Sequence, residues 1–327
     1  MKIVFMGTPD FAVPVLKSLA AVHDVVTVVT QPDRPKGRGY GVVFSPVKEC
    51  AVELNIPVLQ PKKLRFQKNT PETDKYDPEN FIGTITALSA DVFIVVAYGQ
   101  ILPQRILKIP PLGCINIHAS LLPKYRGAAP MQHALLNGDK TTGVTIIYMD
   151  IGMDTGDIIL KKEIEIKNYD RFTDLHNKMA ILSCECILEA LDLIKKGEAP
   201  RQAQNHSEAT YAPMLAKSDG LIDWNKPACV IVNQVRALDF WPGTYSYHNK
   251  QLIKIWNAVL SDESLPGLSE EAKNGQVLAS GEYLDIKTSD GVLRVTEMQR
   301  QNGKRMLTKE FLKGYTIKAG DILGDIK

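Results

Sequence analysis

The chain has 327 residues, of which 44% are hydrophobic and 23% charged, and its formal net charge is +2. This length suggests two domains, because single hydrophobic cores rarely grow beyond about 250–300 residues. The composition argues against large-scale disorder, and the small net charge means that any nucleic-acid-binding surface must be local. No apolar run reaches the ~20 residues that span a bilayer, so we expect no membrane partner.

The first half of the chain alternates short apolar runs with helical patterns, which is typical of an open α/β sheet. Residues 92–97 are apolar on both faces, as in a central parallel strand. The expected strands lie at 2–6, 25–30, 92–97, 114–117, 144–148 and 158–160, and a helix is expected at 11–20. We therefore predict an open, mostly parallel, Rossmann-like sheet.

The clearest helix is expected at 172–196, where apolar residues recur at helical spacing. Asp170 is its expected N-cap and Gly197 its expected end. A polar connector with several Gln, Asn and Ser residues follows it. We place the first domain at 1–198, the linker at 199–217 and the second domain at 218–327.

The second domain shows the two-residue period of β-strands. Leu284 and Ile286 alternate with polar residues, a Ser-Asp-Gly turn follows at 289–291, and Leu293 and Val295 resume the alternation. This pattern indicates a β-hairpin. A second, smaller β-barrel (OB-like) domain fits the length of this part of the chain.

Five cysteines are scattered along the chain, and no two pairs of them have the spacing of zinc ligands. Cys184 and Cys186 fall in a helical pattern, which favours two free thiols over a metal or redox site. Gly7 and Pro9 interrupt the opening apolar run too early for a signal peptide. We expect a cytoplasmic protein with reduced cysteines and no metal.

The segment 114–130, CINIHASLLPKYRGAAP, holds the densest set of chemical groups. Asn116 and His118 stand two residues apart on an expected strand, so their side chains share a face. An amide donor and an imidazole suit the stabilisation of an oxyanion and the movement of a proton. Asp154 lies in a loop between Gly152 and Gly156, where its carboxylate could orient the histidine. Spacing alone does not bring Asp154 to His118, and each residue taken singly fits an ordinary turn or strand end.

This segment resembles the signature of the folate-dependent formyltransferases. The family pattern joins Asn-x-His to Ser-Leu-Leu-Pro, then Arg-Gly, then an Asp in a glycine-rich loop, and all of these are present here. The segments IVFMGTPDFA at 3–12, TQPDRPKGRG at 30–39, VVAYGQILP at 95–103, DTGDI at 154–158 and FWP at 240–242 resemble the branch of the family that formylates methionyl-tRNA. The similarity covers nearly the whole chain.

The resemblance implies a reaction and its partners. The formyl donor would be 10-formyltetrahydrofolate, and the acceptor the α-amino group of methionine on initiator tRNA. Asn116, His118 and Asp154 match the catalytic residues of the family. The stretch that lines the formyl-folate site matches Ser120, Leu121, Leu122 and Pro123. No metal takes part, and we expect a monomer.

The tRNA contacts that the resemblance implies fall in two places. Arg38, with Lys36 beside it, matches a loop that engages the acceptor end of tRNA. Lys217 matches a lysine between the domains, and Met214 stands where a second such lysine is expected. Residues 294–318 add seven Lys or Arg and two Glu, a local charge of +5. Charge runs are usually solvated surfaces, so it is the resemblance that favours RNA docking here.

Three alternatives stay open at this stage. A formyltransferase acting on a nucleotide-sugar amine could share the catalytic residues. A dinucleotide-dependent oxidoreductase could begin with the same strand and Gly7, but the segment that follows lacks the G-x-G-x-x-G pattern. A module that binds RNA or folate without catalysis is the third. The stretch at about 66–83 is longer than expected for the family, and no role is assigned to it.

Overall fold

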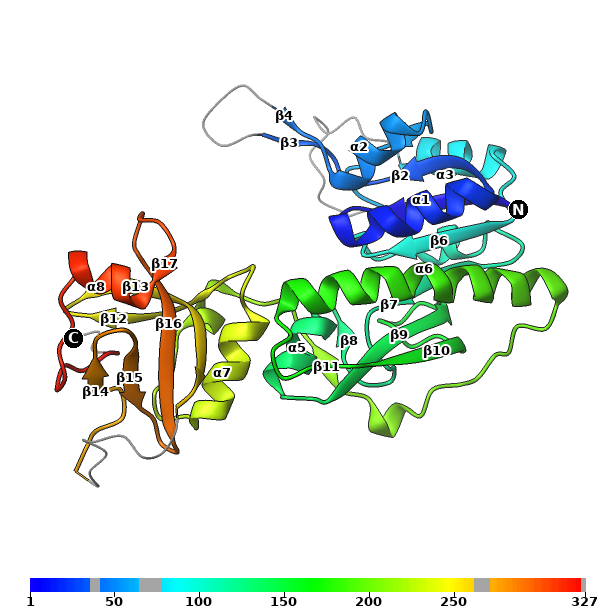
Figure 1. The fold of residues 1–327 in the computed structure, drawn as a ribbon. Helices are drawn as coiled ribbons and strands as arrows, with labels where there is room; N and C mark the ends of the chain where they lie inside the picture. The colour runs from blue at the N-terminus through cyan, green and yellow to red at the C-terminus, as the bar shows by residue number, and fades with distance from the viewer. Residues whose placement is uncertain (36–41, 65–77, 262–270, 325–327) are drawn as a thin grey trace. The chain divides into compact units, whose positions relative to one another are not determined.

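The computed structural model describes residues 1–35, 42–64, 78–261 and 271–324. The chain forms two compact units (Figure 1). The first unit comprises residues 1–130, 141–164 and 176–213, and the second comprises 131–140, 165–175 and 214–327. Two short segments from the middle of the chain are thus grouped with the C-terminal unit.

A seven-stranded sheet forms the centre of the first unit, with the strand order β10-β9-β7-β6-β1-β2-β5. The pairs β1–β2, β1–β6, β2–β5 and β6–β7 are parallel, whereas β7 and β9 are antiparallel. The strands are β1 (Lys2–Gly7), β2 (Asp24–Val29), β5 (Val58–Leu59), β6 (Val92–Val96), β7 (Cys114–His118), β9 (Thr141–Tyr148) and β10 (Ile158–Glu165). The predicted Rossmann-like, mostly parallel sheet is confirmed.

Short helices cover this sheet and connect its strands (Figure 1). They are η1 (Asp10–Ala12), α1 (Val13–Val22), α2 (Pro46–Glu53), α3 (Pro78–Ala87) and α4 (Gln104–Leu107). Phe81 and Ile85 of α3 and Ile106 of α4 are buried in one cluster with Phe93 and Val95 of β6. Because β6 is buried on both faces, its run of five apolar residues has no polar alternation.

The long helix α6 (Phe172–Lys196) has the predicted bounds. Its buried face includes Leu175, Met179 and Cys186 from the predicted apolar stripe. Gly197 ends it in the left-handed conformation, with φ of 72°, and Glu198 N–H donates to the carbonyl of Leu193. The N-cap prediction was one residue early, since Arg171 directly precedes the helix. The Asp170 carboxylate accepts from the backbone N–H of Lys167 instead.

Several very short elements were not predicted, because two-residue strands leave no periodic signal. Among them are β3 (Arg34–Pro35), β4 (Val42–Val43), β8 (Arg126–Gly127), β11 (Tyr211–Ala212) and the helices η2 (His206–Glu208) and η3 (Lys217–Gly220), and the longer α5 (Pro130–Leu136) was not predicted either. The pair β8–β11 is parallel and joins segments 85 residues apart. It fixes the polar connector beside the loop that follows β7.

An antiparallel sheet with the order β12-β13-β16-β15-β14 forms the second unit, and β17 pairs with β16. Its elements are α7 (Ala228–Ala237), β12 (Thr244–His248), β13 (Gln251–Leu260), β14 (Val277–Ser280), β15 (Leu284–Lys287), β16 (Val292–Arg300), β17 (Met306–Leu307) and α8 (Thr308–Gly314). The predicted hairpin is β15–β16. Ile231 and Val235 of α7 and Phe311 of α8 are buried with the apolar side of these strands.

The two edge strands of this sheet are bridged by the segment at 320–324. Val277 N–H of β14 donates to the carbonyl of Asp321, and Gly320 N–H donates back to Val277. Gly324 N–H donates to the carbonyl of Tyr247 in β12. Backbone groups that would be free at both edges are thus paired, which gives the sheet the partly closed form of a small barrel.

Candidate active site

Strand β7 supplies two polar side chains to one face of the first unit. Asn116 and His118 are 9% and 5% exposed. Their strand lies between β6, to which it is parallel, and β9, to which it is antiparallel. Buried polar groups need hydrogen-bonding partners, and both of these side chains contact Asp154 from the β9–β10 loop.

The loop that carries Asp154 is tightly folded. A Cβ on Gly156 would lie 1.7 Å from the carbonyl oxygen of Tyr148, so only glycine fits that close approach. Asp154 itself has φ of 54°, in the left-handed region that costs a non-glycine residue about 1 kcal/mol or more. Its carboxylate accepts a 2.8 Å hydrogen bond from Gly127 N–H. The turn therefore aims the carboxylate at β7.

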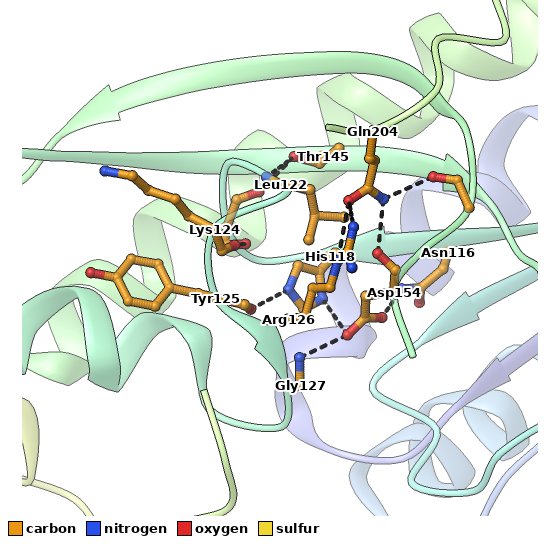
Figure 2. A network of polar contacts seen from close by, with 12 residues as sticks. Asn116, His118, Leu122, Lys124, Tyr125, Arg126, Gly127, Thr145, Asp154 and Gln204 are labelled. Atoms are coloured by element: carbon orange, nitrogen blue, oxygen red, sulfur yellow. Dashed lines mark hydrogen bonds and ion pairs between the residues drawn. The ribbon is translucent and has the colours of Figure 1, made fainter. Parts of the chain in front are cut away.

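The three candidate residues meet around this carboxylate (Figure 2). Asn116 Nδ2 lies 3.4 Å from Asp154 Oδ1, and His118 Nδ1 lies 3.6 Å from Asp154 Oδ2. Both contacts are longer than a strong hydrogen bond. An amide, an imidazole and a carboxylate from two distant parts of the chain thus share one site.

The surroundings of His118 define where its protons lie. Nε2 is 2.8 Å from the carbonyl oxygen of Tyr125, and because a carbonyl only accepts, Nε2 must be the donor. Nδ1 faces the Asp154 carboxylate. Acceptors therefore face both ring nitrogens.

Residues 120–123, which we expect at the folate site, differ in exposure. Ser120 and Leu122 are fully buried. Ser120 Oγ donates to the carbonyl of Lys124, and Leu122 N–H donates to Thr145 Oγ1. Leu121 and Pro123 are half-buried, and the Leu122–Pro123 peptide bond is cis. Ser120 and Leu122 are therefore packed inside the loop, whereas Leu121 and Pro123 stay partly exposed.

Arg126 and Gln204 belong to the site but were not selected from the sequence. Arg126 is 3% exposed, and its Nε and Nη2 donate to Gln204 Oε1 over 3.2 and 2.7 Å. Gln204 Nε2 donates to the backbone carbonyls of Asp154 and Gly156, both at 2.8 Å. Arg126 could have been selected, because it lies within the family signature at 114–130. Gln204 lies in the polar connector, where nothing in the sequence distinguishes it from its neighbours.

A cysteine nucleophile does not fit this site. Cys114, on the same strand as His118, is the cysteine nearest to it in sequence, and burial raises the pKa of its thiol to about 12. A thiol with such a pKa stays protonated and unreactive near neutrality. Among the described residues, no group of three or more His, Cys, Asp or Glu side chains is arranged to hold a metal ion.

The residues expected to contact tRNA are placed only in part. Lys36 and Arg38 lie outside the described residues. Lys217 is exposed at the start of η3, and Met214 is 79% exposed. In the basic stretch 294–318, Arg294 pairs with Asp285, Arg305 with Glu297 and Lys313 with Glu310. Glu297 and Glu310 are already counted in the local charge of +5, so of these three acids only Asp285, which lies outside the stretch, offsets that charge further.

No helix within the described ranges is long and apolar enough to cross a membrane.

The solved structures that resemble this one show the fold. WlaRD, a sugar 3N-formyltransferase, matches with a TM-score of 0.65 and 21% identity over 93% of this chain and 99% of its own. HypX from Aquifex aeolicus, solved with tetrahydrofolic acid, matches at 0.60 and 19% over 95% of this chain. This chain spans about half of HypX, 47% of its length.

Comparisons of sequence are more specific. The formyl transferase family matches residues 1–191, and the formyl transferase C-terminal domain matches residues 214–316. A methionyl-tRNA formyltransferase of Clostridioides difficile is 48% identical over 99% of this chain and 100% of its own length. One of Caldanaerobacter subterraneus is 46% identical over the same shares. The chain therefore belongs to the formyl transferase family, and these two relatives, which match over their full length, are methionyl-tRNA formyltransferases.

Proposed function

We propose that this chain transfers the formyl group of 10-formyltetrahydrofolate to the α-amino group of methionine on initiator methionyl-tRNA. The observation that supports this chemistry is that Asn116 and His118 both contact the carboxylate of Asp154. The acceptor is supported by relatives that match over their full length at 48% and 46% identity. HypX and a Helicobacter canadensis N-formyltransferase, both similar in fold, were solved with tetrahydrofolic acid and folinic acid, which supports a folate donor.

The reaction is a direct attack of an amine on a formyl carbon. The α-amino group of an unstructured peptide has a pKa of about 7.7–8, so a usable fraction is unprotonated near neutrality. Attack places negative charge on the formyl oxygen. Asn116 Nδ2 would donate a hydrogen bond to that oxyanion, and a protonated His118 would stabilise it by its positive charge; one oxyanion donor typically stabilises a transition state by roughly 3–4 kcal/mol. The protonated Cys114 is consistent with a route that needs no covalent intermediate.

Asp154 has two roles in this mechanism. At 3.6 Å from His118 Nδ1, the carboxylate favours the charged imidazolium form. It also accepts the proton that the attacking amine must lose, which then passes to the departing folate nitrogen through water. The 17% exposure of its side chain leaves room for such a proton path.

The partner contacts follow the family pattern. Lys36, Arg38 and Lys217 would contact the tRNA, while 120–123 would line the formyl-folate site. The working division is a catalytic domain at 1–198, a linker at 199–217 and a C-terminal tRNA-binding domain at 218–327. We propose a monomer that acts in the cytoplasm and uses no metal.

One assay tests the acceptor. Purified protein with 10-formyltetrahydrofolate is given charged initiator tRNA, charged elongator tRNA or a nucleotide-sugar amine. We expect formylation of the methionyl initiator tRNA in preference to both others. Transfer to the sugar amine alone would replace this function with the sugar N-formyltransferase alternative. The absence of transfer to any acceptor would leave a binding module.

A further inference from the structure

The connector after α6 places one buried amide side chain against the loop of Asp154. Gln204 is 7% exposed, although the neighbouring residues at 201–203 and 205–208 are exposed. Its segment is attached to the sheet by two backbone hydrogen bonds between Gln202 and Ile158, of 2.8 and 3.1 Å. Farther along, β11 pairs with β8. The position of Gln204 is thus fixed from both sides.

The partners of this amide determine which way it points. The carbonyls of Asp154 and Gly156 can only accept, so the NH₂ group must face them. The guanidinium of Arg126 can only donate, so the amide oxygen must face it. Glutamate would lack the donors, asparagine would be shorter by one methylene, and leucine would have neither function. Figure 2 shows the amide between the two groups.

Arg126 and Gly127, which are neighbours in the chain, therefore hold Asp154 at two points. Gly127 N–H binds its carboxylate, and the side chain of Arg126 binds its backbone through Gln204. The backbone of Asp154 is in the left-handed region, which a non-glycine residue keeps only when its surroundings enforce it. Of the two hydrogen bonds from Gln204 Nε2, one constrains the strained residue itself at its carbonyl, and the other holds the carbonyl of Gly156 two residues farther along.

We propose that Gln204 is a positioning residue that holds the Asp154 carboxylate in register with Asn116 and His118, an inference that rests on the proposed function. Gln204 touches neither the donor nor the acceptor in this mechanism. It acts through Asp154, and formyl transfer depends on it because misplacing a catalytic group by about 1 Å can slow a reaction about 100-fold.

The test compares three variants with the wild-type chain. Gln204→Leu removes both hydrogen-bonding functions, and Gln204→Glu keeps an acceptor for Arg126 while removing the donors to Asp154 and Gly156. Gln202→Leu is the matched control, because it changes the same residue type two positions away on an exposed side chain. We expect kcat to fall 10- to 100-fold in both Gln204 variants, with KM for each substrate within threefold and with the control unchanged.

A double variant separates a positioning role from an independent one. If Gln204 acts through Asp154, Gln204→Leu should cost less than threefold more in a chain that already carries Asp154→Asn. Losses that multiply would overturn the proposal, and so would a kcat in Gln204→Glu equal to that of the control. Unfolding of both Gln204 variants in thermal melts would also overturn it, because the residue would then be structural only. Normal turnover in Asp154→Asn alone would instead refute the proposed mechanism.

Discussion

Replacing Asp154 with asparagine removes one negative charge from the site, and the amide nitrogen takes the place of the Oδ1 acceptor that lies 3.4 Å from Asn116 Nδ2. Asparagine keeps a side-chain oxygen that can accept the hydrogen bond from Gly127 N–H. It cannot carry the charge that faces His118 Nδ1 at 3.6 Å, nor can it accept a proton. The fold should therefore persist while the chemistry slows.

The distance sets the size of the effect. Two unit charges 3.6 Å apart interact by about 4.6 kcal/mol at an effective dielectric constant of about 20, and by about half of that if water screens them twice as strongly. Since about 1.36 kcal/mol corresponds to a factor of ten in rate, the expected loss in kcat is about 50-fold to about 2,500-fold if His118 is protonated. The exposure of 17% for Asp154 and 6% for His118 argues against stronger screening.

Single-turnover formylation of methionyl-tRNA, with both substrates bound, measures this step without product release. Asp157→Asn is the matched control, because Asp157 lies three residues farther along, is 39% exposed and contacts Arg201 only at 3.8 Å. Thermal melts of both variants should match those of the wild-type chain. A rate for Asp154→Asn within threefold of the control would refute the assigned role of the carboxylate.

Three further predictions address the loop, the thiols and the tRNA surface. Gly156→Ala places a methyl group 1.7 Å from the carbonyl oxygen of Tyr148. We expect the free energy of unfolding in denaturant to fall by about 1–3 kcal/mol and kcat to fall at least tenfold. Normal activity in this variant would show that the reaction does not depend on this close approach of the loop. In the native protein at pH 8, iodoacetamide should label the exposed Cys229 but not Cys114 or Cys186. Burial raises the pKa of the Cys114 thiol to about 12 and that of the Cys186 thiol to about 11, so both stay protonated. Peptide mass mapping should show all three cysteines labelled once the protein is unfolded. The affinity for tRNA should fall between about 50 and 200 mM salt, and a salt-independent affinity in filter binding would count against phosphate contacts.

The fold was predictable where burial leaves a periodic pattern in the sequence. Strand β6 and helix α6 were located correctly because their apolar residues follow from the period of each element. The antiparallel direction of β9 was not predicted, since an apolar run carries no information about the partner beside it. The short pair β8–β11 depends on contacts between segments distant in the chain, and its two residues per strand show no period.

The candidate site was predictable to a similar limit. The two-residue spacing of Asn116 and His118 indicated a shared face, and the structure brings both to one carboxylate. The proximity of Asp154 did not follow from its spacing and was implied by the resemblance alone. Gln204 could not be found, because a single amide in a polar connector looks like any solvated residue until its partners are known.

Strained backbone at two residues positions the acceptors around His118. Tyr125 and Asp154 both have left-handed φ values, of 60° and 54°. Tyr125 presents its carbonyl to His118 Nε2, and Asp154 presents its carboxylate to His118 Nδ1. Relaxing either residue would turn an acceptor away from the imidazole. Hydrogen bonds such as those from Gln204 therefore offset the free-energy cost of this strain when the chain folds. The strain then adds nothing to the activation barrier when charge develops on the formyl oxygen.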